Sequence, residues 1–310
     1  MSIAWVAASV RARAMARRRL GREGIRRVGS AGSLQAACHQ LVDTGYARAA
    51  PATDLASAQR AVAEAVLWDV RILAGWMPSG GTPIARAVVA AFERENCWDH
   101  LRRLGGRLPP GQPAPEPFEL GSLSTAWHRV RATSSLTELR AELSASPWGE
   151  MPVDDPAAFR DAMAAAWLRR VADDLPGVEG LAIQAAALQV ARSRLLEHRE
   201  PGERERGDLE ALLGSRWLEA TTLPDLRTAL DPLAGRILQG VESPVRLWSA
   251  EAALWQEVAD TGMRLLRDPL SSPEVVVGAV AVLAADAFRV RAALADAALG
   301  GRGEVLGGVA

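Results

Sequence analysis

Residues 32–37 read GSLQAA, and two later stretches, SSLTEL at 134–139 and TTLPDL at 221–226, follow the same pattern. In each stretch a hydroxyl residue stands before a leucine, and another apolar residue follows that leucine at a spacing of seven. These following residues are Leu41, Leu143 and Leu230. Ser and Thr are favoured helix N-caps, and apolar residues seven apart share one helix face. We therefore expect three short capped helices, each near the start of one copy of a repeated unit.

Three tryptophans support the same division. Trp68, Trp167 and Trp255 are separated by 99 and 88 residues, close to the 102 and 87 residues that separate the motif leucines. Apolar residues around them recur at helical spacing, so we expect these tryptophans to lie in the core. A second long helix is predicted to close each unit after a turn. The three closing helices are expected at 84–104, 181–198 and 274–299.

Two segments are expected to separate the units. One holds five prolines, which cannot continue a helix and predict an extended linker. They are Pro109, Pro110, Pro113, Pro115 and Pro117. The other segment is HREPGERERGD at 198–208, which is charged and contains Pro and Gly. The predicted organisation is a first repeat at 1–108, a linker at 109–121, a second repeat at 122–200 and a third at 201–310.

Composition predicts an all-α fold. Of 310 residues, 49% are hydrophobic and 24% charged, which is typical of a folded chain with a substantial core. Strand-forming aromatic residues are scarce, with one Tyr and four Phe, whereas Ala, Leu, Arg and Glu are abundant.

The same composition argues against several kinds of active site. The sequence contains no lysine, so all 36 basic residues are arginine. A phosphate-binding P-loop, a Schiff-base enzyme and an S-x-x-K hydrolase each need a lysine. The acidic pairs Asp154/Asp155 and Asp173/Asp174 suit a helix start and a helix end better than acid–base catalysis. We expect no catalytic residue and no enzyme activity.

Metal, cofactor and disulfide sites are not indicated either. The histidines are far apart, and none has a second ligand at metal-binding spacing. They are His39, His100, His128 and His198. The Gly-rich segment 300–308 lacks the strand–turn–helix context of a dinucleotide site and is expected to fray. Cys38 and Cys97 form no recognisable framework, which favours an intracellular location. The longest uncharged apolar stretch, 275–285, is about half of what a membrane span needs.

Four stretches resemble one protein family, the d subunit of V-type rotary ATPases and its counterpart in the A-type enzymes of archaea and bacteria. Trp5 followed by ASVRAR at 8–13 resembles the start of that family, and GSLQAACHQLVDTGY at 32–46 is similar to its first short-helix motif. The stretch FERENCWDHLR at 92–102 resembles a helix of the first repeat, and 273–300 is similar to the last long helix. The order of these stretches spans essentially the whole chain.

The resemblance implies three helical repeats around a pseudo-threefold axis, which form a funnel. It further implies a non-catalytic central-stalk subunit, located in the cytoplasm on the cytoplasmic face of the membrane. Its implied partners are the central shaft and the membrane rotor ring, in an ATP-linked complex that transports ions, expected to be protons. The resemblance implies no cofactor, no small-molecule substrate and no nucleic acid.

An arginine cluster at 11–27 is the expected partner-binding surface, with Arg11, Arg13, Arg17 and Arg18 as its candidate residues. An acidic shaft or anionic lipid headgroups would complement it, although a solvated basic helix face is an equally good interpretation. A free-standing helical-repeat adaptor is the first alternative function. Nucleic-acid binding is the second, but a net charge of −1 and the absence of aromatic residues among these arginines argue against it.

Overall fold

The structure is a computed structural model that describes residues 3–108 and 114–301. Within these ranges every regular element is helical and no strand occurs, so the all-α prediction is confirmed. The chain divides into two units. Unit 1 combines Met1–Gly81 with Trp248–Ala310, and unit 2 is the continuous segment Thr82–Leu247.

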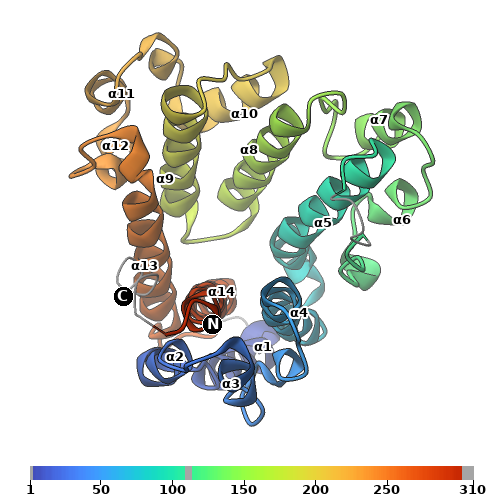
Figure 1. Cartoon of the computed structure of the whole chain (residues 1–310), viewed down its shortest axis with the longest axis vertical. Coiled ribbons are helices and arrows are strands. Elements are labelled where there is room, and N and C mark those ends of the chain that lie inside the picture. Colours follow the sequence, from blue (N-terminus) through green and yellow to red (C-terminus); the bar gives the residue numbers. More distant parts are fainter. Residues whose placement is uncertain (1–2, 109–113, 302–310) are drawn as a thin grey trace. The chain divides into compact units, whose positions relative to one another are not determined.

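Unit 1 is built around one long buried helix, α14. The helices of this unit are α1 (Val6–Arg17), α2 (Gly21–Gly29), α3 (Leu34–His39), α4 (Leu55–Ala74), α13 (Leu247–Leu266) and α14 (Pro273–Ala298). Most side chains of α14 are buried, and the helix packs against α1, α2, α3 and α4, which lie below and to the right of it in Figure 1. Because valine and alanine face outward on almost every side of α14, it needs partners all round.

A close backbone contact joins α13 to α14. A Cβ atom added at Gly262 would lie 2.8 Å from the Gly278 carbonyl oxygen, and one at Gly278 would lie 2.8 Å from the Gly262 carbonyl oxygen. Only glycine at both positions allows the two helices to approach this closely. Nearby, the rings of Trp255 and Phe288 stack with centroids 4.7 Å apart.

Unit 2 packs its long helices in sequence. Its helices are α5 (Thr82–Leu104), α6 (Trp127–Val130), α7 (Leu136–Ser144), α8 (Pro156–Asp174), α9 (Glu179–Val190), α10 (Glu203–Leu213), α11 (Leu223–Ala229) and α12 (Pro232–Gly235). The helix α8 lies against α5, α9 and α10, and α9 also contacts α12. Asp155 accepts hydrogen bonds from the backbone N–H groups of Ala157 and Ala158, and thus caps α8 as expected.

Short 3₁₀ segments complete both units. They are Ile3–Trp5, Ala47–Ala49, Ser79–Gly81, Gly121–Leu123, Arg216–Glu219, Arg236–Leu238 and Pro244–Arg246. Among the residues described, no helix combines the length and the apolar character needed to cross a bilayer.

The three predicted short helices are confirmed. Ser33 caps α3, Ser135 caps α7 and Thr222 caps α11, and each side chain accepts a hydrogen bond from the backbone N–H three residues later. The apolar residues expected on their inner faces, Leu41, Leu143 and Leu230, are buried.

The tryptophan prediction is wrong for Trp68. This side chain is 47% exposed and lies under the guanidinium groups of Arg48 and Arg71, 5.1 and 5.9 Å from its ring centroid. Trp167 and Trp255 are half-buried. The buried residues Val62, Val66, Val70 and Leu73 share one face of α4, and at 3.6 residues per turn Trp68 points away from that face.

Around residue 200 the predicted helix and separator differ in detail from the structure. The helix expected at 181–198 is α-helical only to Val190 and continues as a π-helix over Ala191–Leu196. The expected separator at 198–208 already contains the first turns of α10, which begins at Glu203. Pro115 and Pro117 lie in non-helical chain, as expected of a linker, whereas Pro109, Pro110 and Pro113 lie outside the described residues. The Gly-rich segment 300–308 lies outside them beyond Gly301.

Candidate partner-binding surface

The four candidate arginines all lie on or next to α1, but they differ in what they contact. Arg11 and Arg17 are exposed. Arg13 is half-buried, and its guanidinium donates to the backbone carbonyls of Leu266, Asp268 and Leu270 at 3.4, 2.6 and 3.3 Å. Arg13 therefore holds the α13–α14 loop against α1 and is an internal contact of unit 1.

Arg18 has an acidic partner on α4. Its Nη2 atom lies 3.2 Å from Oδ1 of Asp69, while its side chain stays 59% exposed. Burial raises the pKa of Asp69, and the nearby charges of Arg18 and Arg11 only partly oppose that effect. An ion pair as exposed as this one contributes little to stability, so Arg18 remains available to a partner.

The exposed face of α1 carries apolar side chains near its N-terminal end and arginines further along. Ile3 is 89% exposed, Val10 is 61% and Val6 is 44%, although all three are aliphatic. Their spacing of three and four residues places them on one side of the helix, opposite a buried face formed by Ala8, Ala12, Met15 and Ala16. The arginines were evident from the sequence, whereas this apolar stripe was missed, although the spacing of residues 3, 6 and 10 could have revealed it.

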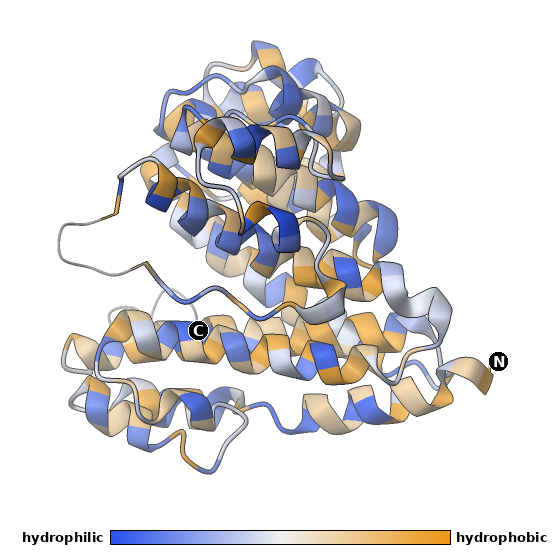
Figure 2. Ribbon diagram, turned by 90° about the vertical axis from the view of Figure 1, so that its right-hand side faces the viewer, coloured by the Kyte–Doolittle hydropathy of each residue, from blue (hydrophilic) through white to orange (hydrophobic). Residues whose placement is uncertain are grey.

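The basic surface continues onto α2. Ile25 and Val28 are buried against α14, whereas Arg22, Arg26 and Arg27 are exposed. The helices α1 and α2 both pack on α14, so their outer sides belong to the same layer of unit 1. Figure 2 shows the N-terminal end of this layer in hydrophobic colours.

A buried carboxylate on α14 positions α2. Asp286 accepts hydrogen bonds from the backbone N–H groups of Leu20 and Gly21 at 2.8 and 3.0 Å, and from the hydroxyl of Tyr46 at 2.8 Å. Burial and the negative charge of Asp286 raise the pKa of Tyr46, so this hydroxyl stays protonated and donates. A carboxylate at a helix N-terminus satisfies backbone donors that lack partners and complements the helix dipole.

Glu93 on α5 plays the same part in unit 2. Its Oε1 atom accepts from the backbone N–H groups of Thr125, Ala126 and Trp127 at 2.9, 2.7 and 2.7 Å, at the start of α6. Its Oε2 atom accepts from the indole N–H of Trp148 at 3.1 Å. Both carboxylates therefore lie on a long helix and fix the beginning of a short helix that belongs to another part of the chain.

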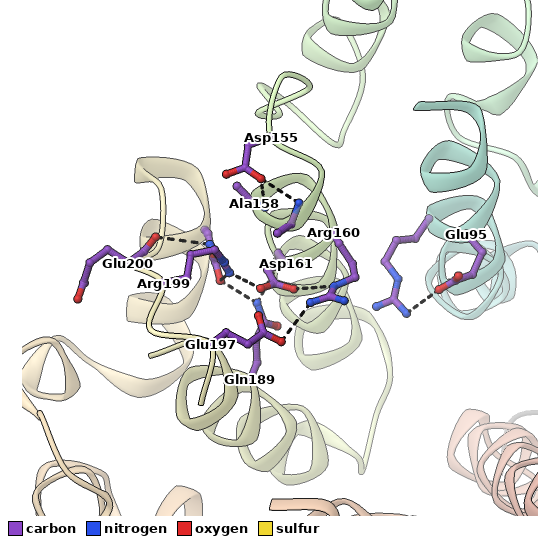
Figure 3. A network of polar contacts seen from close by, with 12 residues as sticks. Glu95, Asp155, Ala158, Arg160, Asp161, Gln189, Glu197, Arg199 and Glu200 are labelled. Atoms are coloured by element: carbon purple, nitrogen blue, oxygen red, sulfur yellow. Dashed lines mark hydrogen bonds and ion pairs between the residues drawn. The ribbon is translucent and has the colours of Figure 1, made fainter. Parts of the chain in front are cut away.

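A polar network replaces such a cap between α9 and α10. Arg199 forms an ion pair with Asp161 of α8, which Figure 3 shows. It also lies 3.1 Å from Oε2 of Glu205. Gln189 of α9 donates to Oε1 of Glu205 at 3.1 Å and to the carbonyl oxygen of Asp161 at 2.8 Å. Because Glu205 is fully buried, its pairing is needed to keep a charge inside the protein.

The remaining acidic pairs and histidines form no reactive cluster in the described part of the chain. Asp173 pairs with Arg169 at the end of α8, as expected of a helix end. No group of His, Cys, Asp and Glu side chains among the described residues is arranged to hold a metal ion. Cys38 and Cys97 are buried and free.

No protein-family model matches the chain, and no curated protein matches its sequence.

Proposed function

We propose that this chain is a non-catalytic central-stalk subunit of a V-type or A-type rotary ATPase. In this role its three helical repeats stand around a pseudo-threefold axis and form a funnel. The funnel receives the central shaft, and the opposite side rests on the membrane rotor ring. The protein then transmits torque for ion transport without turning over a substrate itself.

The observation that carries the proposal is which long helix packs against which short helices along the chain. The closing helix of the first repeat, α5, holds α6 and α7 of the second, and α9 of the second holds α10 and α12 of the third. The closing helix of the third repeat, α14, packs on α2 and α3 of the first. Within each unit, the closing helix of one repeat thus contacts the start of another, and these pairings support the proposed threefold order.

The polar contacts follow the same order. Glu93, Gln189 and Asp286 each lie on a closing helix and each bond to the start of the following repeat. Buried, fully bonded polar groups fix one geometry between helices more strictly than apolar packing alone. A torque-transmitting body benefits from such fixed joints because any slack between helices would absorb rotation.

Affinity purification tests the proposal. The tagged protein is recovered from its own cells in mild detergent, and the proteins that accompany it are identified by mass spectrometry. We expect the shaft and ring proteins of a rotary ATPase in the eluate. Their absence, in cells that express them, would contradict the proposal and would favour the helical-repeat adaptor.

A matched pair of variants shows whether the arginines take part. Arg11 and Arg17 are exposed, so Arg11→Glu with Arg17→Glu leaves the internal contacts of Arg13 intact. The control changes two exposed arginines of unit 2, Arg131 and Arg206, to glutamate. If both variants recover the shaft and ring equally well, the α1 arginines are not part of the protein–protein interface.

A further inference from the structure

The charge of the chain is strongly uneven. Residues 1–27 contain eight arginines and one acidic residue, Glu23, for a net charge of +7, whereas the whole chain carries −1 and the remainder therefore −8. Seven of these arginines are exposed in unit 1, and only Arg13 is half-buried. Concentrated positive charge on one layer of helices attracts an anionic surface.

The apolar stripe lies on the same exposed face as part of that charge. Val10 and Arg17 are seven residues apart, so the exposed side of α1 that they share changes from aliphatic to basic along its length, and Arg11 is exposed on the adjoining side. At a rise of 1.5 Å per residue, Val10 and Arg17 are separated by roughly 10 Å along the axis. No acidic residue occurs in α1.

A second apolar segment lies near the start of α1. The ring of Trp5 packs against the turn that follows α4. A Cβ atom added at Gly81 in this turn would lie 3.0 Å from the Trp5 ring and 2.6 Å from the Cβ atom of Met77. Trp76 in this turn is 50% exposed. Exposed tryptophan and aliphatic side chains bordered by arginines are typical of proteins that bind at the membrane interface.

We propose that the outer face of α1 docks unit 1 on an anionic lipid bilayer. Ile3, Val6 and Val10 enter the boundary between headgroups and acyl chains, and Arg11 and Arg17 contact lipid phosphates. A bilayer suits this face because exposed aliphatic side chains lie beside exposed arginines on it. A nucleic acid would complement the arginines but would leave the aliphatic stripe in water.

Vesicle flotation tests the proposal on the full-length protein. We expect the protein to float with vesicles of mixed phosphatidylcholine and phosphatidylglycerol, and to bind phosphatidylcholine vesicles at least about tenfold more weakly. Binding should weaken as salt rises, because exposed charges are screened beyond about 8 Å at physiological ionic strength. Equal binding to both kinds of vesicle, or to neither, would overturn the proposal.

Two variants separate the apolar and the basic contributions. Val6→Ser with Val10→Ser removes exposed aliphatic surface, and Arg11→Glu with Arg17→Glu reverses two charges; we expect each to weaken vesicle binding by roughly tenfold or more. The matched controls in unit 2 are Val245→Ser, at a side chain 75% exposed, and Arg131→Glu with Arg206→Glu. Circular dichroism checks that every variant keeps its helices, and Val10→Ser alone replaces the double variant if that one fails to fold.

The test is independent of the rotary role. Vesicles of pure lipid contain no shaft or ring, so flotation can succeed even where affinity purification recovers neither of them. Conversely, if the arginine variant loses the shaft or ring while the unaltered protein ignores anionic vesicles, the face is a protein interface and the lipid proposal is wrong.

Discussion

The carboxylate of Glu93 meets five donors, four at Oε1 and one at Oε2, although it lies inside unit 2. Burial on its own would raise the pKa of this carboxyl, but the hydrogen bonds from Ala126, Trp127, Thr125 and Ser124 outweigh it and hold the pKa below its ordinary value. The group is therefore charged in the folded protein, where hydrogen-bond donors surround it and the nearby guanidinium of Arg170 adds an opposite charge.

Replacing Glu93 by glutamine should destabilise the protein by about 2–4 kcal/mol, because an amide lacks the charge and places N–H groups where the carboxylate accepts. Urea unfolding followed by circular dichroism measures the loss. Glu95→Gln, two residues along α5, is the control because Glu95 is exposed and forms its ion pair with the adjacent Arg94. We expect a change of less than about 0.5 kcal/mol for the control. Similar losses for both variants would refute a special role for Glu93.

His100 is a second buried polar residue on α5, and its contacts define its tautomer. Arg103 can only donate, so its Nη2 atom, 3.0 Å away, donates to Nδ1 of the imidazole. The proton then lies on Nε2, which donates to Oγ1 of Thr133 at 2.8 Å, and that hydroxyl donates to the carbonyl of Val130. Burial, together with the charge of Arg103, lowers the pKa of His100 to about 4, so the ring is neutral in the folded state.

This lowered pKa predicts a loss of stability in mild acid. Between pH 6.5, the ordinary pKa, and pH about 4, the unfolded chain binds a proton at residue 100 that the folded protein does not. The free energy of unfolding should therefore fall as the pH falls through this window, by up to about 3 kcal/mol from this residue. Urea unfolding at several pH values should give a shallower pH dependence for His100→Gln, whereas His39→Gln, at an exposed site, should keep that of the unaltered protein. An unchanged dependence in His100→Gln would contradict the assignment.

Among the elements, α13 and α14 show how a helix pair can depend on two glycines. Their backbones approach at Gly262 and Gly278, where neither helix has room for a methyl group. The spacing between the two helices is thus determined by the backbones themselves, which makes this contact less adaptable than one between flexible side chains.

Gly278→Ala should therefore destabilise the protein by about 1–3 kcal/mol, since the added methyl group would lie 2.8 Å from both the Gly262 carbonyl oxygen and the Leu265 Cβ atom. Thermal unfolding should show the midpoint falling by a few degrees. Gly207→Ala in α10 is the matched control, because no atom lies within 4 Å of its added Cβ. Alanine favours a helix over glycine, so we expect the control to be neutral or slightly stabilising. A Gly278 variant as stable as the control would show that the helices can separate at little cost.

The elements also show what the sequence could predict. Ser33, Ser135 and Thr222 were identifiable as caps because each bonds to a backbone N–H only three residues away. Asp286 and Glu93 cap helices too, but the donors of Asp286 lie 265 and 266 residues away and those of Glu93 about thirty residues away. No local pattern indicates such partners, and charged residues within a helix are usually assigned to its solvated face.

The candidate site was predictable to a similar extent. The arginine cluster of 11–27 is visible in the sequence, and the structure leaves most of it exposed. Arg13 differs from its neighbours because a loop more than 250 residues away supplies three carbonyl groups to it. The packing of the rest of unit 1 determines which arginines are free for a partner. The sequence of α1 alone does not contain that information.

At the scale of the whole molecule, the division into units differs from the order of the chain. Unit 2 is continuous, whereas unit 1 joins residues before 82 to residues after 247. The N-terminal helices α1 to α4 obtain much of their apolar contact from α14. Their buried faces therefore depend on a segment that the ribosome produces much later.

During synthesis this arrangement imposes a delay. At 5–20 residues per second, roughly ten to forty-five seconds pass between translation of Ala74, the end of α4, and that of Ala298, the end of α14. For that time α1 to α4 have emerged without the helix that covers them, while unit 2 can already complete its own contacts. The nascent chain thus exposes its N-terminal apolar faces to chaperones and to other nascent chains, and premature termination before α14 would leave these faces permanently uncovered.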